Sequence, residues 1–227
     1  MQRSNTWDKK ARHTVTKIKN LLTNLSIQVR TDQFKIFFNN LSPNKHSKAL
    51  DVGVTSDEVL KDSNIFERLY PYSERLTVAT IEDNKKFAQM YPKLKKVVKI
   101  YPGNKLPFKD HQFDIVTSWA VLEHVGGYKN QAKFLNELLR VGKSVFITTP
   151  YRGCVYEPHT GLPIVQWLPL YWFRKICKLL NMDFWSNESN LNPLFVRDIK
   201  KMKLIKKLNI KIYNMFGILP SHIILTN

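Results

Sequence analysis

The chain has 227 residues, with 36 Lys and Arg against 18 Asp and Glu, which gives a formal net charge of +18. Hydrophobic residues make up 43% and aromatic residues 12%, enough for a buried core, and this composition argues against an intrinsically disordered chain. No apolar run reaches the ~18 residues of a membrane-spanning helix, and the first five residues do not resemble a signal peptide. Cys154 and Cys177 have neither metal-ligand nor disulfide spacing, so we expect free thiols in a cytoplasmic protein.

The positive charge comes mostly from lysine, with 27 Lys against 9 Arg. Arginine is the preferred residue for recognising phosphate groups, because its planar side chain forms paired hydrogen bonds. A basic chain can still bind nucleic acid or an anionic membrane through its overall field. The composition therefore favours a solvated basic surface and leaves a polyanionic partner open.

The N-terminal region has two helical patterns. Apolar residues recur at helical spacing between residues 15 and 25, and Thr31 and Asp32 are typical caps for a second, shorter helix. Turn-forming residues follow at 42–44. We expect residues 1–45 to form a helical extension.

Strands alternate with helices from residue 48 onward. Five short apolar runs predict buried strands, at residues 49–54, 76–81, 97–101, 113–118 and 144–149. The clearest helix between them begins at a predicted cap, Asn130, and ends at Gly142. Apolar strands separated by helices indicate a parallel sheet covered on both faces. We expect a single Rossmann-like, doubly wound α/β domain over residues 46–227.

The last part of the chain predicts a helix and a hairpin. Asn192 followed by Pro193 is typical of a helix start, and the apolar spacing continues to Leu208. Two further apolar runs, at residues 210–213 and 222–226, predict an antiparallel hairpin at the edge of the sheet.

Acidic residues follow the first two predicted strands. Ligands of open α/β sheets bind beyond the carboxyl ends of the strands. Gly53 allows close approach of the backbone to a ligand, while Asp51 can accept hydrogen bonds from an ammonium or hydroxyl group. Glu82 or Asp83 can accept both hydroxyls of a ribose. These residues predict a small-molecule site at this edge.

A longer block makes the prediction specific. Residues 106–125 read LPFKDHQFDIVTSWAVLEHV. Together with the ends of the first two strands, this block closely resembles class I S-adenosylmethionine-dependent methyltransferases of the subgroup with LPF, FD and VLEHV motifs, over residues 48–150. The resemblance implies S-adenosylmethionine as the cofactor. It implies cofactor contacts at the ends of four strands: Asp51, Gly53, Val54, Thr55, Glu82, Asp83, Gly103, Asn104, Ser118, Trp119 and Ala120.

Two positions depart from the family pattern. Thr55 and Asp57 stand where the family has the second and third glycines of its first loop. Residues 102–104, Pro-Gly-Asn, replace the acid that contacts adenine, so Asn104 or the backbone N–H of Gly103 would take that role. These departures keep a non-catalytic binding subunit as an alternative.

The segment after the fifth strand resembles that of a subset of these methyltransferases, several of them associated with surface-glycan synthesis. Its sequence is similar to their TPNR, EHTxxP and HWLP motifs, although Tyr151 and Gln166 replace Asn and His. We expect residues 150–190 to form an acceptor-side insert or lid that binds the acceptor through Tyr151 and Arg152. The aromatic run at 167–173 predicts a lid helix or, alternatively, contact with an anionic membrane surface.

Methyl transfer requires a positioned nucleophile and, for a hydroxyl acceptor, removal of its proton. Imidazole groups titrate near neutral pH, so His124 and His159 are candidates for this step, with Glu157 orienting a histidine or binding the acceptor. A structural role remains the alternative for each: His124 in packing or capping, and Glu157 with His159 in bracing the loop. The sequence predicts no metal-ligating set.

The predicted function is therefore S-adenosylmethionine-dependent methylation of a small-molecule or glycan-type acceptor, including a lipid-linked one, by a cytoplasmic enzyme with peripheral membrane contact left open. An RNA methyltransferase is the enzyme alternative, supported only by charge. The chain lacks the Asn/Asp-Pro-Pro-aromatic motif of nucleic-acid amino-methylating enzymes. A nicotinamide-dependent oxidoreductase is disfavoured because the phosphate-binding glycine pattern is missing. The oligomeric state stays open.

Overall fold

The computed structural model describes residues 4–56 and 61–227, with side chains from residue 21 onward. The chain divides into two compact units, and we describe each by itself. Unit 1 comprises Met1–Ser42 with Thr55–Pro71, and unit 2 comprises Pro43–Val54 with Tyr72–Asn227.

Unit 1 contains one long helix, α1 (Ser4–Leu41), and a short one, α2 (Ile65–Leu69). The predicted division of the N-terminal region into two helices is wrong, because α1 runs unbroken through Thr31. The hydroxyl of Thr31 donates to the carbonyl of Ile27, one turn earlier, at 2.7 Å. This bond satisfies the hydroxyl inside a helix, so Thr31 does not cap a new one.

Aromatic packing joins α1 and α2. Phe37 is fully buried, and its ring lies 5.2 Å from that of Phe66 in an edge-to-face arrangement. Phe66 in turn stacks on Tyr70 at 5.1 Å. Such aromatic pairs contribute about 0.5–1.5 kcal/mol each beyond the area they bury. These contacts stabilise the packing of the short helix α2 against α1.

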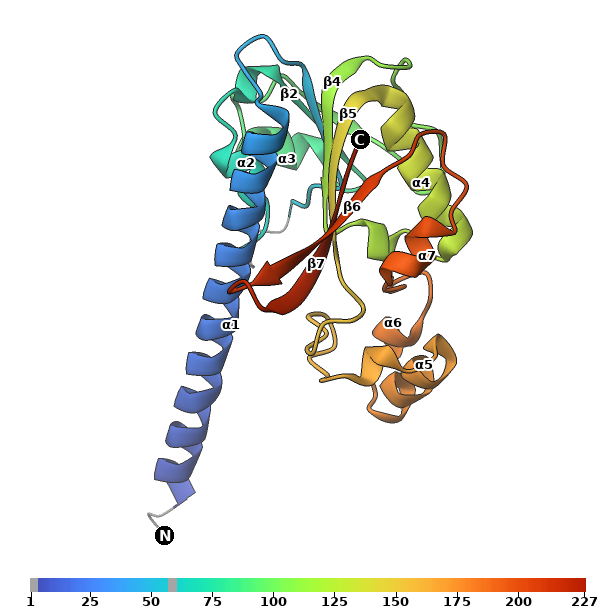
Figure 1. Cartoon of the computed structure of the whole chain (residues 1–227). Coiled ribbons are helices and arrows are strands. Elements are labelled where there is room, and N and C mark those ends of the chain that lie inside the picture. The colour runs from blue at the N-terminus through green and yellow to red at the C-terminus, as the bar shows by residue number, and fades with distance from the viewer. Residues whose placement is uncertain (1–3, 57–60) are drawn as a thin grey trace. The chain divides into compact units, whose positions relative to one another are not determined.

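Among the described residues, unit 2 contains a seven-stranded sheet (Figure 1). Its strands are β1 (Ala49–Val52), β2 (Leu76–Thr80), β3 (Lys96–Lys99), β4 (Phe113–Trp119), β5 (Gly142–Pro150), β6 (Asn209–Met215) and β7 (Leu219–Thr226). The order is β3-β2-β1-β4-β5-β7-β6, parallel from β3 to β5, with β7 antiparallel to β5 and β6 antiparallel to β7. The Rossmann-like fold, the five strands and the edge hairpin are thus confirmed.

The central strands are buried over their whole length. All four residues of β1 and all five of β2 are buried, as expected for a parallel sheet covered on both faces. The register places Asp51 beside Val78 of β2 and Thr117 of β4. Since Asp51 is a buried acid at the carboxyl end of β1, it needs a polar partner there.

Helices and short 3-10 turns connect the strands. They are η1 (Ser73–Arg75), α3 (Asn84–Met90), η2 (Leu122–His124), α4 (Tyr128–Val141), η3 (Val165–Trp167), α5 (Leu170–Leu179), α6 (Asp183–Ser186) and α7 (Val196–Lys200). Helix α4 lies along β4 and β5. It begins two residues before the predicted cap Asn130, with Gly127 as its N-cap, and ends at Gly142 as predicted.

The long helix predicted to start at Asn192 is wrong, because only α7 forms in that region. The side-chain amide of Asn192 donates to Gln131 and so serves tertiary packing instead of a helix cap. Further on, the side chain of Asn136 accepts from the N–H of Ile205 and donates to the carbonyl of Lys203. These bonds hold the chain in an irregular path where the helix would have continued.

Helices α5 and α6 lie together beyond the carboxyl end of β5 (Figure 1). Phe173 and Cys177 of α5 are buried with Leu191 in a small separate core. Both cysteines are free thiols, as predicted, and burial raises the pKa of Cys154 to about 11. The thiols are therefore protonated at neutral pH and poorly reactive.

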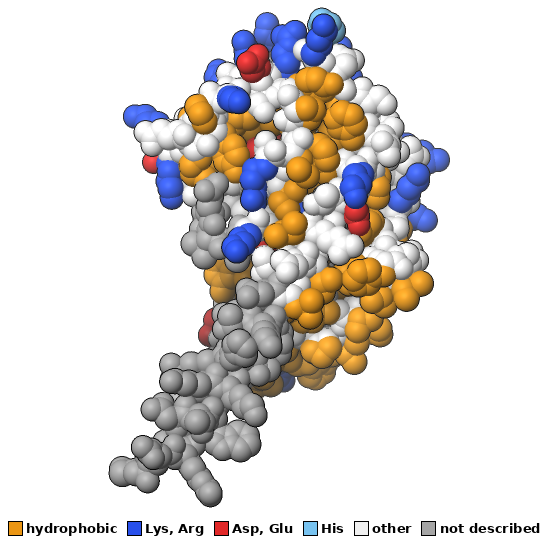
Figure 2. Space-filling model, turned by 90° about the vertical axis from the view of Figure 1, so that its left-hand side faces the viewer, with side chains coloured by type: hydrophobic (Ala, Val, Ile, Leu, Met, Phe, Trp, Pro, Cys, Tyr) orange, Lys and Arg blue, Asp and Glu red, His pale blue; other side chains and the backbone are white. Residues whose placement is uncertain are grey.

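The surface shows where charge and apolar side chains gather. Lys and Arg side chains are spread over the face drawn in Figure 2, whereas hydrophobic side chains gather on its lower part. No helix in residues 4–56 and 61–227 is long and apolar enough to cross a membrane.

Candidate active site

The carboxyl end of β1 holds a buried acid that the neighbouring strand positions. The hydroxyl of Thr117 on β4 donates to Asp51 Oδ1 at 2.5 Å. The next residue of β4, Ser118, donates its hydroxyl to the carbonyl of Val52 at 2.8 Å. Because both β4 side chains reach across to β1, the ends of these two strands form one rigid edge.

Gly53 adopts a conformation that other residues resist. Its φ of +103° lies in the region that favours glycine, and its N–H donates to the carbonyl of Ala79 on β2 at 2.9 Å. A Cβ at this position would lie 2.3 Å from a methyl group of Val121. The carbonyl of Val54 then accepts from the hydroxyl of Thr80 at 2.9 Å. The chain can leave β1 in this direction only with glycine at 53.

The two acids after β2 have different surroundings. Asp83 is the N-cap of α3, and its carboxylate accepts from the N–H groups of Lys85 and Lys86 at 2.9 and 3.2 Å. These backbone hydrogen bonds lower the pKa of Asp83. Glu82 is half-buried at the strand end, where its backbone N–H donates to Thr80. The Asp83 carboxylate is thus engaged in capping α3.

The turn after β3 contains the two residues predicted to read adenine. Gly103 has φ +75°, and its carbonyl accepts from the Lys133 ammonium. The N–H of Asn104 donates to the carbonyl of Tyr101 at 3.2 Å. Both Gly103 and Asn104 are exposed, and a Cβ at Gly103 would meet nothing within 4 Å. The turn is therefore open to solvent on this side.

The end of β4 redirects the chain sharply. Ala120 has φ +53°, a strained value for a residue with a side chain, and its N–H donates to the carbonyl of Thr148 on β5 at 2.9 Å. Trp119 precedes it, with its ring 5.2 Å from that of Phe146. Backbone strain of this kind is concentrated at functional sites. Here it turns the chain directly into η2.

Thr55 belongs to unit 1 and is described there. Its N–H donates to Asn64 Oδ1 at 3.3 Å, and its carbonyl accepts from Asn64 Nδ2 at 2.8 Å. The side chain of Asn64 thus holds the backbone on both sides of Thr55, where the family has glycine. Asp57 lies outside the described residues.

Three side chains converge beyond β4 and β5. The two histidine rings, His124 from η2 and His159 from the segment after β5, lie 4.7 Å apart at 86°. Glu123 Oε1 lies 3.7 Å from His124 Nε2 and 3.9 Å from His159 Nε2. We call Glu123, His124 and His159 the EHH cluster. The two histidines predicted from sequence are therefore neighbours, and Glu123 joins them.

Glu157 supports the cluster from behind. Its Oε1 accepts from His159 Nδ1 at 2.7 Å and its Oε2 from the N–H of Thr160 at 2.5 Å. Burial would raise the pKa of Glu157, but the hydrogen bonds from His159 and from the Thr160 N–H lower it overall. Glu157 is thus an ionised, buried acid that orients His159.

The sequence did not predict the other residues that contact the cluster. Thr149 donates its hydroxyl to Glu123 Oε2 at 2.8 Å, and the carbonyl of Asn190 lies 2.6 Å from His124 Nδ1. The ring of Trp185 on α6 lies 5.3 Å from that of His159. Glu123 itself was visible as the single acid of the VLEHV motif, next to His124. Asn190 and Trp185 carry no such local signal.

Tyr151 and Arg152 occupy the base of the segment after β5. Arg152 is buried, donates from Nε to the carbonyl of Gln166 and from Nη2 to that of Leu168, and stacks 4.7 Å from the ring of Phe195. Tyr151 pairs with Leu194 as an isolated parallel bridge. These contacts brace the segment itself.

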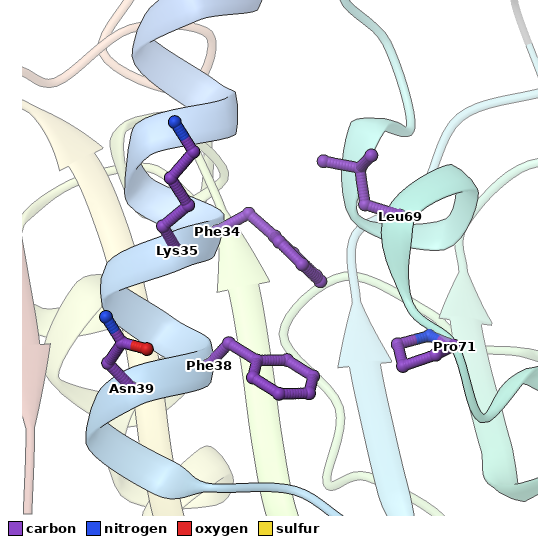
Figure 3. Close-up of a pocket in the computed structure, with 6 residues that line it drawn as sticks. All are labelled: Phe34, Lys35, Phe38, Asn39, Leu69 and Pro71. Carbon is purple, nitrogen blue, oxygen red and sulfur yellow. The ribbon is translucent and has the colours of Figure 1, made fainter.

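Unit 1 contains an open apolar hollow of about 390 Å³. Phe34 and Phe38 on α1 face Leu69 and Pro71 across it, and Lys35 and Asn39 lie at its margin (Figure 3). None of the residues predicted to bind the cofactor lines this hollow.

Two kinds of similarity link this chain to known proteins: a match to a family model over one region, and a shared fold. Residues 50–145 match the family described as methyltransferase domain. No curated protein is significantly similar to the chain in sequence.

Many solved structures share the fold. A S-adenosylmethionine-dependent methyltransferase from Methanosarcina mazei has a TM-score of 0.51 at 14% identity, covering 84% of this chain and 95% of its own. One from Aquifex aeolicus has a TM-score of 0.50 at 16% identity, covering 93% and 97%. Magnesium protoporphyrin IX methyltransferase from Synechocystis, with bound S-adenosylhomocysteine, has a TM-score of 0.50 at 12% identity, covering 88% and 81%.

Together, the family match and the sheet order support a methyltransferase of the class I fold, for which S-adenosylmethionine is the expected methyl donor.

Proposed function

We propose that this enzyme methylates a small-molecule or glycan-type acceptor, including a lipid-linked one, and that the acceptor binds beside the EHH cluster. The observation that carries the proposal is the convergence of His124 and His159 beyond the ends of β4 and β5. Just before the cluster, the predicted cofactor residues Ser118 and Trp119 end β4, and Ala120 follows them.

The residues at the ends of β1 and β2 fit a nucleoside cofactor. Gly53 leaves its backbone uncovered by a side chain, and the Glu82 carboxylate follows β2 at the position expected for ribose recognition. Asp51, held by Thr117, would face the amino-acid end of S-adenosylmethionine. The bound cofactor supplies an activated methyl group, while these residues bind and orient it. We assign ribose binding to Glu82 because capping engages Asp83.

On the acceptor side, polar groups are arranged to bind and orient an oxygen or nitrogen nucleophile. Glu157 orients His159, and the carbonyl of Asn190 orients His124. An acceptor held in line with the methyl group gains most of its rate from this positioning. Tyr151 and Arg152 contribute by anchoring the segment that covers this side.

Calorimetric titration with S-adenosylhomocysteine tests the proposal first. We expect saturable binding to the wild-type protein and at least tenfold weaker binding to a Glu82→Ala variant. An absence of binding at millimolar ligand, in folded protein, rejects the cofactor role and leaves a non-catalytic binding subunit. RNA binding with a steep salt dependence would instead favour the RNA methyltransferase alternative.

Exposed apolar side chains favour a lipid-linked acceptor in particular. Tyr171, Trp172 and Leu179 on α5 are exposed, as is Phe184 on α6, and the ammonium group of Lys175 lies 5.3 Å from the Trp172 ring. Aromatic rings with adjacent cations are typical of helices that rest on anionic membrane surfaces.

Vesicle sedimentation tests the membrane contact. We expect the protein to pellet with anionic phosphatidylserine vesicles more than with neutral phosphatidylcholine vesicles. A double variant, Tyr171→Ser with Trp172→Ser, should lose most of this binding, because it removes exposed rings and leaves the buried Phe173 in place. Equal pelleting of variant and wild type would reject α5 as the contact surface.

A further inference from the structure

We propose that the EHH cluster is a binding site for a divalent transition-metal ion, with Glu123 Oε1, His124 Nε2 and His159 Nε2 as ligands. Each of the three residues offers one ligand atom, and among the described residues these atoms all lie within 4.8 Å of one another. The proposal concerns metal binding itself, so it stands apart from methyl transfer.

One carboxylate oxygen at the centre of the cluster has no hydrogen bond. The Glu123 side chain is 1% exposed, and its Oε2 accepts from Thr149 at 2.8 Å. Its Oε1 is buried and has no hydrogen-bond partner among the described residues, although it faces both imidazoles. Leaving a charged buried oxygen unsatisfied is costly. A cation between Oε1 and the two rings would satisfy it.

The hydrogen bonds behind the histidines prepare both rings to bind a metal. The Asn190 carbonyl can only accept, so His124 Nδ1 at 2.6 Å carries the proton and Nε2 carries the lone pair. The Glu157 carboxylate fixes His159 in the same way, with its Oε1 2.7 Å from Nδ1. In both neutral rings the lone pair is therefore on Nε2, the atom that lies 3.7 Å (His124) or 3.9 Å (His159) from Glu123 Oε1. Metal-binding histidines almost always donate their other N–H to a carbonyl or carboxylate.

The ligand types select the metal. Two imidazoles with one carboxylate suit zinc or another late first-row divalent ion, whereas magnesium and calcium prefer sites built from oxygen. Metal–ligand bonds of about 2.0–2.2 Å separate tetrahedral ligands by roughly 3.4 Å. The two separations from Glu123 Oε1, 3.7 and 3.9 Å, therefore need shifts of a few tenths of an ångström, and the remaining pair of ligand atoms lies within 4.8 Å.

The site has room for a further ligand. Three protein ligands leave at least one coordination position open, as in catalytic zinc sites. The His124 side chain is 33% exposed and that of His159 17%, so the open side faces solvent. If the proposed function holds, an acceptor oxygen would occupy this position. His124 and His159 would then act as metal ligands, and the ion would make a bound hydroxyl more acidic.

Zinc titration of the tag-free 227-residue chain tests the site. We expect one Zn²⁺ per chain, with binding weakened at least about 100-fold by Glu123→Gln or His159→Ala, and no comparable binding of Mg²⁺. Removing an outer partner costs about 10–100-fold in metal affinity, so Glu157→Gln should weaken binding by that amount. His46→Ala is the matched control, because His46 is exposed in the turn before β1.

Cobalt gives a second readout that does not depend on activity. Co²⁺ bound by two imidazoles and a carboxylate should give visible absorption bands that Zn²⁺ displaces and that His159→Ala abolishes. Circular dichroism of each variant establishes that it is folded, and His159→Gln replaces any variant that is not. Absence of zinc binding, or unchanged binding in the Glu123 and His159 variants, overturns the site and leaves a hydrogen-bonded brace.

S-adenosylhomocysteine titration of the same preparations separates the two proposals. Retained S-adenosylhomocysteine binding without zinc binding rejects only the metal site. Zinc binding without S-adenosylhomocysteine binding keeps the metal site and rejects the cofactor role.

Discussion

The cofactor side of the sheet edge, at the ends of β1 and β2, is built differently from the acceptor side around η2. Backbone conformation shapes the first, through Gly53 at φ +103° and the strand-to-strand bonds of Asp51 and Ser118. Buried polar side chains shape the second, where Glu123 is held by Thr149 of β5 and Glu157 by the nearby His159 and Thr160. We therefore expect added side-chain atoms to disrupt the cofactor side, and the loss of a hydrogen-bond partner to disrupt the acceptor side.

Gly53→Ala should do the most damage on the cofactor side. We expect the unfolding free energy to fall by about 2–5 kcal/mol, because overpacking against Val121 costs about 1–3 kcal/mol and the backbone conformation a further 1–2. Urea denaturation measures the change. Gly103→Ala is the control, since it meets nothing within 4 Å and should lose only about 1 kcal/mol. Similar losses in both variants would contradict the close approach at Gly53.

Gln131→Leu tests the acceptor side. Gln131 is fully buried on α4, and its Nε2 donates to the carbonyls of Leu122 and Asn192, while its Oε1 accepts from the Asn192 amide. Leaving such groups unsatisfied should cost about 1–3 kcal/mol. Denaturation should show this loss while S-adenosylhomocysteine binding persists. Lys129→Leu, at an exposed α4 position, should change stability by less than about 0.5 kcal/mol.

Exchanging the two acids after β2 should separate stability from ligand binding. Asp83→Ala removes the cap of α3 and should cost about 1 kcal/mol, with unchanged affinity for S-adenosylhomocysteine. Glu82→Ala should show the reverse, with weakened affinity and a stability change below about 0.5 kcal/mol. Calorimetry and denaturation of both variants decide the matter. Loss of affinity in Asp83→Ala alone would move the ribose contact to Asp83.

Asp114 should give a small, pH-dependent effect away from both sides. The Lys143 ammonium and the Lys48 N–H hydrogen-bond its carboxylate and lower its pKa. A lowered folded-state pKa stabilises the protein above the unfolded value of 3.8, and this contribution disappears as the pH falls through the folded-state value. Asp114→Asn should thus lose under about 1 kcal/mol at pH 7, since the pair is largely exposed, and nothing at pH 2. Unfolding at both pH values measures it, and an equal loss at pH 2 would exclude titration of Asp114 as the cause.

Strand prediction succeeded because its signal is local. The apolar runs around β1, β2, β4 and β5 are continuous in sequence, and burial on both faces of a parallel sheet demands that continuity. The two wrong helix predictions relied on polar residues whose side chains can hydrogen-bond either as helix caps or elsewhere in the fold. Thr31 bonds within α1, and Asn192 bonds to Gln131, so neither caps a helix.

Local sequence also carried the two histidines and Glu157, but it gave no reason to group them with Glu123. Glu123 and His124 are adjacent within one motif. His159, in contrast, lies in the separate segment after β5, and Asn190 lies 66 residues from His124. Contacts at such separations depend on how η2 packs against the chain after α6. A pattern of neighbouring residues cannot encode that packing.

The amino-acid sequence alone is sufficient for the α/β class, for the sheet with its edge hairpin, and for the methyltransferase resemblance, because each is written in contiguous residues. Only the tertiary structure shows that Glu123, His124 and His159 lie close together and that Glu123 Oε1 has no hydrogen bond among the described residues. Sheet formation follows from local burial patterns, whereas convergence of side chains requires the folded backbone to bring distant segments into contact.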